Sequence, residues 1–226
     1  MQNIFLVPNW FLGYDIILEL IFALVTLFVS IFAFKIHGIT HQPNIKKFAF
    51  GFLLISIGYF IQTLLNSVFF FYIQHLYFSP QHAYLILLTY TIMVYAYSYL
   101  MLLGLITLVY MTFNTSNIKI HLLISALSLI VLVFGMDELL LFYTMSALIT
   151  LFIVLHYRKN YKIKKRVNTL IVLLAFCAMF ISYIIFIFST EHELFYFLGH
   201  AVKLIAYSMI LSNLVSVLNK GKTSRV

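Results

Sequence analysis

Seven long apolar runs dominate the sequence and limit its possible folds more than any other feature. They lie at about 11–35, 48–72, 84–112, 118–135, 138–157, 167–189 and 194–218. A helix needs about 20 mostly apolar residues to cross a bilayer. Only 9% of the 226 residues are charged and 64% are hydrophobic, too few polar groups to cover a soluble globule. The sequence therefore predicts an all-α integral membrane protein, a seven-transmembrane helix bundle that forms one domain over 1–226 without a soluble domain.

Basic residues are confined to one side of these predicted spans. They follow the first, third and fifth runs or close the chain, and they account for 13 of the 14 Lys and Arg residues: Lys35, Lys46, Lys47, Lys119, Arg158, Lys159, Lys162, Lys164, Lys165, Arg166, Lys220, Lys222 and Arg225. Short cytoplasmic loops are rich in Lys and Arg. We therefore expect a multi-pass protein of the cell membrane with its N-terminus outside and its C-terminus in the cytoplasm. The net charge of +8 then reflects topology and contact with lipid headgroups, and no nucleic-acid partner is expected.

Three charged residues lie inside the predicted spans, namely Asp15, Glu19 and Lys203. Ionisable groups in the hydrocarbon region are costly and by default indicate a functional site. Glu19 and Lys203 are each nine residues from the predicted outer ends of their helices, near Trp10 and Leu194. Both should lie about 13 Å below that edge at 1.5 Å per residue. This match predicts an ion pair, whose alternative role is only to fix the register of two helices.

Other polar residues recur at helical spacing around this pair. His200 and Tyr207 share one helical face with Lys203. The predicted ligand-binding or ion-pair site in the outer half of the bundle thus consists of Asp15, Glu19, His200, Lys203 and Tyr207. Side chains from the second and third runs are candidates for the pocket wall: Tyr59, Gln62, Asn66, Tyr90 and Tyr97.

Motifs for other chemistry are weak or missing in the sequence. The outer histidines and acids, such as His75, His192 and Asp137, have no metal-ligand spacing, and only His200 is deep enough to hold a haem. No nucleotide-binding loop or hydrolase triad is present. We therefore expect no metal, no other cofactor and no enzymatic activity. Gly51 and Gly58 share a helix face, which favours close packing of helices over a binding role.

Two segments resemble the third class of membrane-associated sensor domains, the seven-helix units that precede bacterial and archaeal histidine kinases and diguanylate cyclases. They are "YDIILELIFALVTLFVSIFAF" near the start and "LGHAVKLIAYSMIL" near the end. The family pattern, a Glu in the opening span and His-x-x-Lys in the closing one, corresponds to Glu19, His200 and Lys203. The resemblance implies a sensor unit. Because no kinase or cyclase sequence occurs before Val226, we expect any signal to pass to a separate cytoplasmic or membrane partner.

The leading interpretation is a sensor- or receptor-like membrane protein that binds a small molecule or ion near the Glu19–Lys203 pair. One alternative is a small-solute or proton transporter, although Pro8, Pro43 and Pro80 all lie outside the spans, whereas many carriers have broken helices. Another alternative is a retinal-type protein with a Schiff base at Lys203. The third run offers no acidic counter-ion for it, and the sole tryptophan, Trp10, lies at the outer end.

Overall fold

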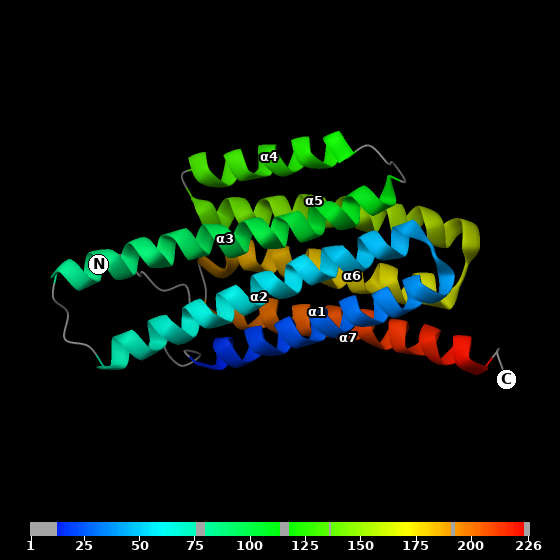
Figure 1. Ribbon diagram of the computed structural model, residues 1–226, viewed down its shortest axis with the longest axis horizontal. Helices are drawn as coiled ribbons and strands as arrows, with labels where there is room; N and C mark the ends of the chain where they lie inside the picture. Colours follow the sequence, from blue (N-terminus) through cyan, green and yellow to red (C-terminus); the bar gives the residue numbers. More distant parts are fainter. Residues whose placement is uncertain (1–12, 76–79, 114–117, 136, 191–192, 224–226) are drawn as a thin grey trace.

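The computed structural model describes residues 13–75, 80–113, 118–135, 137–190 and 193–223 (Figure 1). These residues form seven α-helices and one short 3₁₀ helix: α1 Tyr14–Thr40, α2 Pro43–His75, α3 Pro80–Thr112, α4 Ile118–Phe134, α5 Glu138–Lys164, α6 Val167–Ile187, η1 Phe188–Thr190 and α7 Glu193–Thr223. Six of the helices are long and apolar enough to cross a membrane, and α4, with 17 residues, is a shorter apolar helix. The predicted all-α membrane bundle of seven helices is confirmed.

Several helices continue further at the basic end than the apolar runs predict; α2 begins at Pro43 instead of residue 48, and α7 ends at Thr223 instead of residue 218. α1 ends at Thr40 instead of residue 35, and α5 ends at Lys164 instead of residue 157. Each is followed by a residue in the left-handed conformation, His41 with φ 52° and Lys165 with φ 47°. Hydropathy marks only the part of a helix that suits lipid, and the added part of α5 is rich in lysine and arginine, which are good helix formers. The predicted ends were therefore too early.

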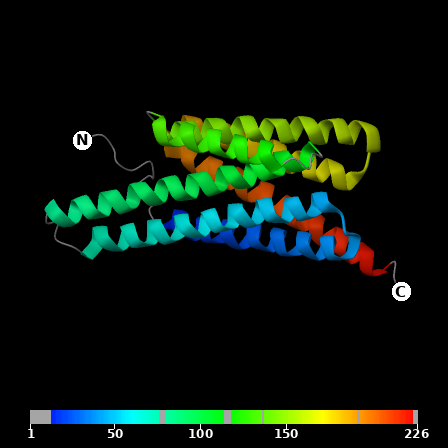
Figure 2. The ribbon, with the colours of Figure 1, turned by 45° about the horizontal axis from the view of Figure 1, so that its top comes forward.

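Six of the helices form a closed ring. Neighbours pack in the order α1, α2, α3, α5, α6 and α7, and α7 packs back against α1 (Figures 1 and 2). α4 lies outside the ring against α3 and α5. The predicted Glu19–Lys203 pair requires the first and last helices to be neighbours, and they are: α1 packs against α7.

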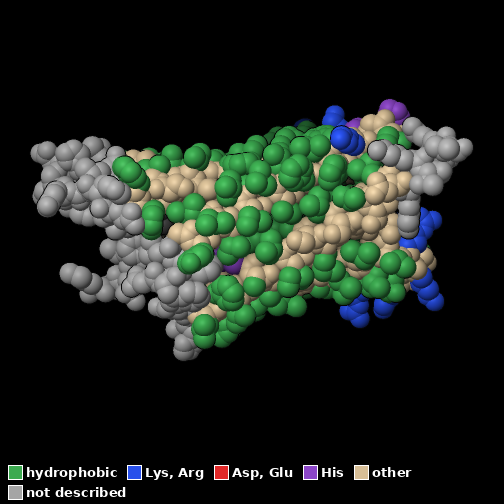
Figure 3. Space-filling model, turned by 90° about the horizontal axis from the view of Figure 1, so that it is seen from below, with side chains coloured by type: hydrophobic (Ala, Val, Ile, Leu, Met, Phe, Trp, Pro, Cys, Tyr) green, Lys and Arg blue, Asp and Glu red, His purple; other side chains and the backbone are tan. Residues whose placement is uncertain are grey.

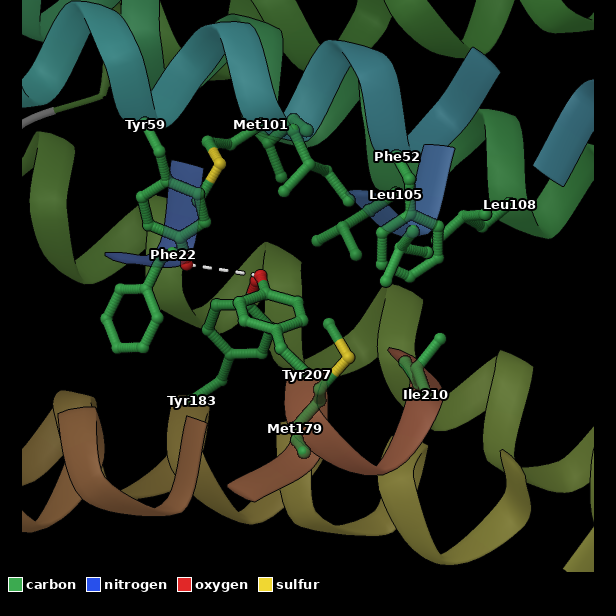
Figure 4. Close-up of a cluster of buried hydrophobic side chains, with 14 of the residues drawn as sticks. Phe22, Phe52, Tyr59, Met101, Leu105, Leu108, Met179, Tyr183, Tyr207 and Ile210 are labelled. Atoms are coloured by element: carbon green, nitrogen blue, oxygen red, sulfur yellow. Dashed lines mark hydrogen bonds between the residues drawn. The ribbon is translucent and has the colours of Figure 1, made fainter. Parts of the chain in front are cut away.

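Large side chains fill the centre of the ring (Figure 4). Phe22 comes from α1, Phe52 and Tyr59 from α2, and Tyr183 and Tyr207 from α6 and α7. In the described part of the chain α2 and α7 do not pack directly on each other. Their tyrosines nevertheless meet, because the Tyr59 and Tyr207 hydroxyl oxygens are 3.1 Å apart. Long aromatic side chains therefore bridge the interior between two helices that both flank α1 but do not touch each other.

The outer surface of the bundle is apolar along its length and basic at one end (Figure 3). Large hydrophobic side chains such as Leu64 and Ile205 are more than half exposed, at 64% and 58%. In a soluble protein a patch of this extent would be an aggregation hazard. On these membrane-length helices it is the surface that faces lipid.

Glycines allow α2 and α3 to approach closely. A β-carbon added at Gly51 would lie 3.0 Å from the Gly104 carbonyl oxygen, and one added at Gly104 would lie 2.7 Å from that of Gly51. A β-carbon at Gly58 would meet the Met101 side chain at 3.0 Å. The expected packing role of Gly51 and Gly58 is confirmed, and Gly104 is the partner on α3 that makes the approach possible.

Gly104→Ala is expected to lower the free energy of unfolding by about 2 kcal/mol, since overpacking a close interface typically costs 1–3 kcal/mol. The added β-carbon would overlap the Ile55 side chain, 2.5 Å away, and the Gly51 carbonyl oxygen, so backbone must move. Reversible unfolding in mixed micelles measures the change. Gly38→Ala is the matched control, because nothing lies within 4 Å of its added β-carbon. Equal stability of the two variants would show that the α2–α3 contact does not require a glycine.

Candidate functional site: a buried polar cluster between α1, α2, α6 and α7

Glu19 is the most deeply buried acid of the described residues, with 0% of its surface exposed. The Asn66 amide nitrogen on α2 donates to both carboxylate oxygens of Glu19, at 2.9 Å each. A buried acid is tolerated only where its oxygens are hydrogen-bonded. Asn66, which the sequence placed in a possible pocket wall, is therefore the residue that holds Glu19 in place.

Lys203 is also buried, with 4% of its surface exposed, and it faces α6. Its amine nitrogen lies 4.3 Å from the ring centroid of Phe186 and 4.7 Å from that of Tyr183. Aromatic faces attract cations through their quadrupole, an effect worth about 0.5–2 kcal/mol. Among the described residues, ring faces are thus the immediate environment of this amine.

Among the described residues Glu19 and Lys203 do not contact each other directly, so their ion pair stays a prediction. Asn66 binds both oxygens of the acid, and the lysine amine lies over rings of α6. Their two helices, α1 and α7, nevertheless pack against each other. Counting residues from a helix end fixes depth but leaves the rotation of the helix undetermined, and that rotation turns Lys203 toward α6.

His200 lies in an aromatic enclosure one helical turn from Lys203. Its ring centroid is 4.6 Å from Tyr196, 5.0 Å from Phe186 and 5.7 Å from Phe22, with the Phe22 ring stacked nearly parallel to it. The side chain is 4% exposed. Phe186 therefore touches both members of the His-x-x-Lys pair and joins them to α6.

The other predicted site residues have varied positions. The Tyr207 hydroxyl is hydrogen-bonded to the Tyr59 hydroxyl at the centre of the ring of helices. Asp15 is buried but accepts a hydrogen bond from the Gly13 backbone N–H at 2.9 Å, which helps to begin α1. Tyr97 is buried and packs edge-on against Phe142 of α5 at 6.2 Å, while Gln62 is half-buried. The Tyr90 side chain lies outside the described residues.

Sequence reasoning missed the aromatic residues that surround Lys203 and His200. These are Tyr183, Phe186 and Tyr196. The chain contains 16 Tyr and 24 Phe, so single aromatic residues in an apolar run carry no distinguishing signal. Tyr183 and Phe186 are three apart and share a face of α6, which was the available indication. That face becomes meaningful only once α6 is known to pack against α7.

No group of three or more histidine, cysteine or acidic side chains that could hold a metal occurs among the described residues. Of the outer histidines and acids weighed for such a site, only Asp137 has a described side chain; those of His75, His82, Glu138 and Glu193, and all of Glu191 and His192, lie outside that part of the chain. The absence of metal therefore stays a prediction.

Comparisons with known protein families, curated proteins and solved structures found no match. Fold and site therefore define the class of this protein from its own residues. It is a multi-pass integral membrane protein, a bundle of seven helices with a buried polar cluster at its centre. The resemblance to membrane-associated sensor domains stays a prediction.

Proposed function

We propose that the protein is a non-enzymatic membrane receptor or sensor whose buried centre at Glu19 and Lys203 responds to a small anion or to protonation. The observation that supports this most is the position of the Lys203 amine, which is buried over two aromatic rings instead of against a carboxylate. Moving a cation from water to a protein interior costs several kcal/mol. Contact with the Tyr183 and Phe186 ring faces offsets only part of that cost.

An amine in this position is stabilised either by an anion that approaches it or by loss of its proton. Glu19 is one possible anion, but it would have to leave Asn66 on α2 to reach Lys203 on α7. α1 packs against both α2 and α7, so that exchange would move α1 relative to its two neighbours. A carboxylate or phosphate ligand that binds Lys203 would favour one arrangement over the other. Such a two-state element is what a sensor needs.

Transport is the second candidate, because a carboxylate and an amine on adjoining helices can also serve as steps of a proton relay. Many carriers bind their substrate where helices are interrupted at mid-membrane. In the described part of the chain α1 and α7 run as single helices past Glu19 and Lys203. This continuity favours the receptor over the transporter.

Proteoliposomes containing the wild-type protein are expected to show no proton flux above that of protein-free vesicles. A flux that is present in the wild type and lost in Glu19→Gln would overturn the receptor proposal in favour of transport. Asp137→Asn is a matched control, because Asp137 is an exposed acid at the start of α5, outside the cluster.

A binding measurement tests the receptor directly. A panel of mono- and dicarboxylates and inorganic phosphate is expected to contain a compound that raises the melting temperature of the wild type but not of Lys203→Met. If every compound changes the melting temperature of the wild type and of Lys203→Met equally, and acidification also changes both equally, the cluster has only a structural role.

A further inference from the structure

A second polar site lies at the basic end of the bundle, away from the buried cluster. A groove of about 580 Å³ runs between α2 and α4. Lys46 and Lys47 lie at its α2 side, Phe50 and Ile118 form apolar walls, and Tyr110 and His121 also line it. The groove thus combines cationic side chains with an apolar surface in one continuous hollow.

The cationic part of the groove is held in a fixed arrangement. The Lys47 amine lies 4.3 Å from the centroid of the Tyr110 ring, and that ring packs edge-on against His121 at 5.3 Å. His121 in turn shares a 3.1 Å hydrogen bond with the Thr107 hydroxyl. α3 and α4 therefore support the position of a lysine that belongs to α2.

Two helices also begin at this groove, α2 at Pro43 and α4 at Ile118. The first backbone N–H groups of a helix point toward its N-terminal end and favour an anion there. Two helix starts and two lysines together give the site a positive character that is strongest where the bundle meets water.

The apolar part of the groove opens on the lipid-facing side of the bundle. Phe50 is 49% exposed and Ile118 is 63% exposed, as expected for side chains in contact with hydrocarbon. A soluble phosphate would use the cations but not these walls. An anionic phospholipid uses both, because its headgroup lies at the membrane edge and its acyl chain runs along the helices.

We infer that this groove is a binding site for an anionic phospholipid, whose phosphate lies at Lys46 and Lys47 and whose acyl chain lies along Phe50 and Ile118. The site is independent of the buried cluster and of the proposed receptor function. It would tie the loop between α1 and α2 to one leaflet of the membrane, since Lys46 and Lys47 lie in the first turns of α2.

The test uses detergent-solubilised protein titrated with phosphatidylglycerol, phosphatidylcholine or inorganic phosphate, with bound lipid counted by native mass spectrometry. The wild type is expected to retain phosphatidylglycerol in preference to phosphatidylcholine. Lys46→Gln with Lys47→Gln should weaken binding by about fivefold for each lysine removed. Lys47→Arg should keep it, because the charge and the ring contact are preserved.

Arg158→Gln with Lys159→Gln is the matched control, since it removes two charges from the basic end of α5, outside the groove. The control should bind phosphatidylglycerol like the wild type. Equal loss in both double variants would overturn the proposal by showing that only diffuse surface charge matters. Equal retention of phosphatidylcholine, or equally tight binding of inorganic phosphate, would also overturn it.

Discussion

Asn66→Leu is expected to lower the free energy of unfolding by about 3 kcal/mol. Glu19 is completely buried, and the Asn66 amide donates to both of its carboxylate oxygens at 2.9 Å. Removing the donor leaves the acid in an apolar environment without these bonds, which costs 1–3 kcal/mol for a neutral group and more for a charged one. Reversible unfolding of the purified protein in mixed micelles measures the change.

The double variant Glu19→Leu with Asn66→Leu separates this cause from a general packing defect. Replacing both members of a buried polar pair by apolar groups is often nearly neutral. We therefore expect the double variant to be more stable than Asn66→Leu alone, by roughly 2 kcal/mol. Ser67→Leu, one residue further along α2 at an exposed position, is the control for leucine itself. If Glu19→Leu and Asn66→Leu, each measured alone, lower the free energy of unfolding by amounts that add up in the double variant, a direct Glu19–Asn66 contact is contradicted.

The sequence was sufficient to predict the seven helices and the contact between the first and last of them. Apolar length is a direct physical requirement of the bilayer, so it is readable without any knowledge of packing. The peripheral position of α4 was not predictable in this way. Its 17 residues are as apolar as those of the other spans, and only the packing of α3 against α5 excludes it from the ring.

The centre of the bundle shows where sequence reasoning reached its limit. Helical periodicity correctly gathered Tyr59 and Asn66 on one face of α2, and the structure places both in contact with groups from α1 and α7. The partner of Lys203 was not predictable, because it depends on how α7 is rotated against α6. A buried amine can lie against an aromatic ring instead of a carboxylate. In a chain with 16 Tyr and 24 Phe, the sequence does not indicate which ring makes that contact.

Lys203→Met is expected to leave the protein at least as stable as the wild type while abolishing its response. Methionine fits the volume of the lysine stem and removes an amine whose burial is costly. Since the amine lies over Phe186 and Tyr183 instead of contacting an acid, little is lost that methionine cannot replace by its own contact with the rings. We expect a gain of about 1–3 kcal/mol in the free energy of unfolding, measured as for Asn66→Leu.

The stability of Lys203→Met and its response to anions or acid together decide the role of the Lys203 amine. Lys35→Met is the control, because it removes an exposed lysine that also lies over a ring, that of Phe32, at 5.8 Å. Loss of several kcal/mol in Lys203→Met would mean that the amine holds α7 against α1 and that Glu19 and Lys203 only fix the helix register. A more stable protein without a response to anions or acid would instead show that a destabilising group is retained at the centre of the bundle because the function requires it.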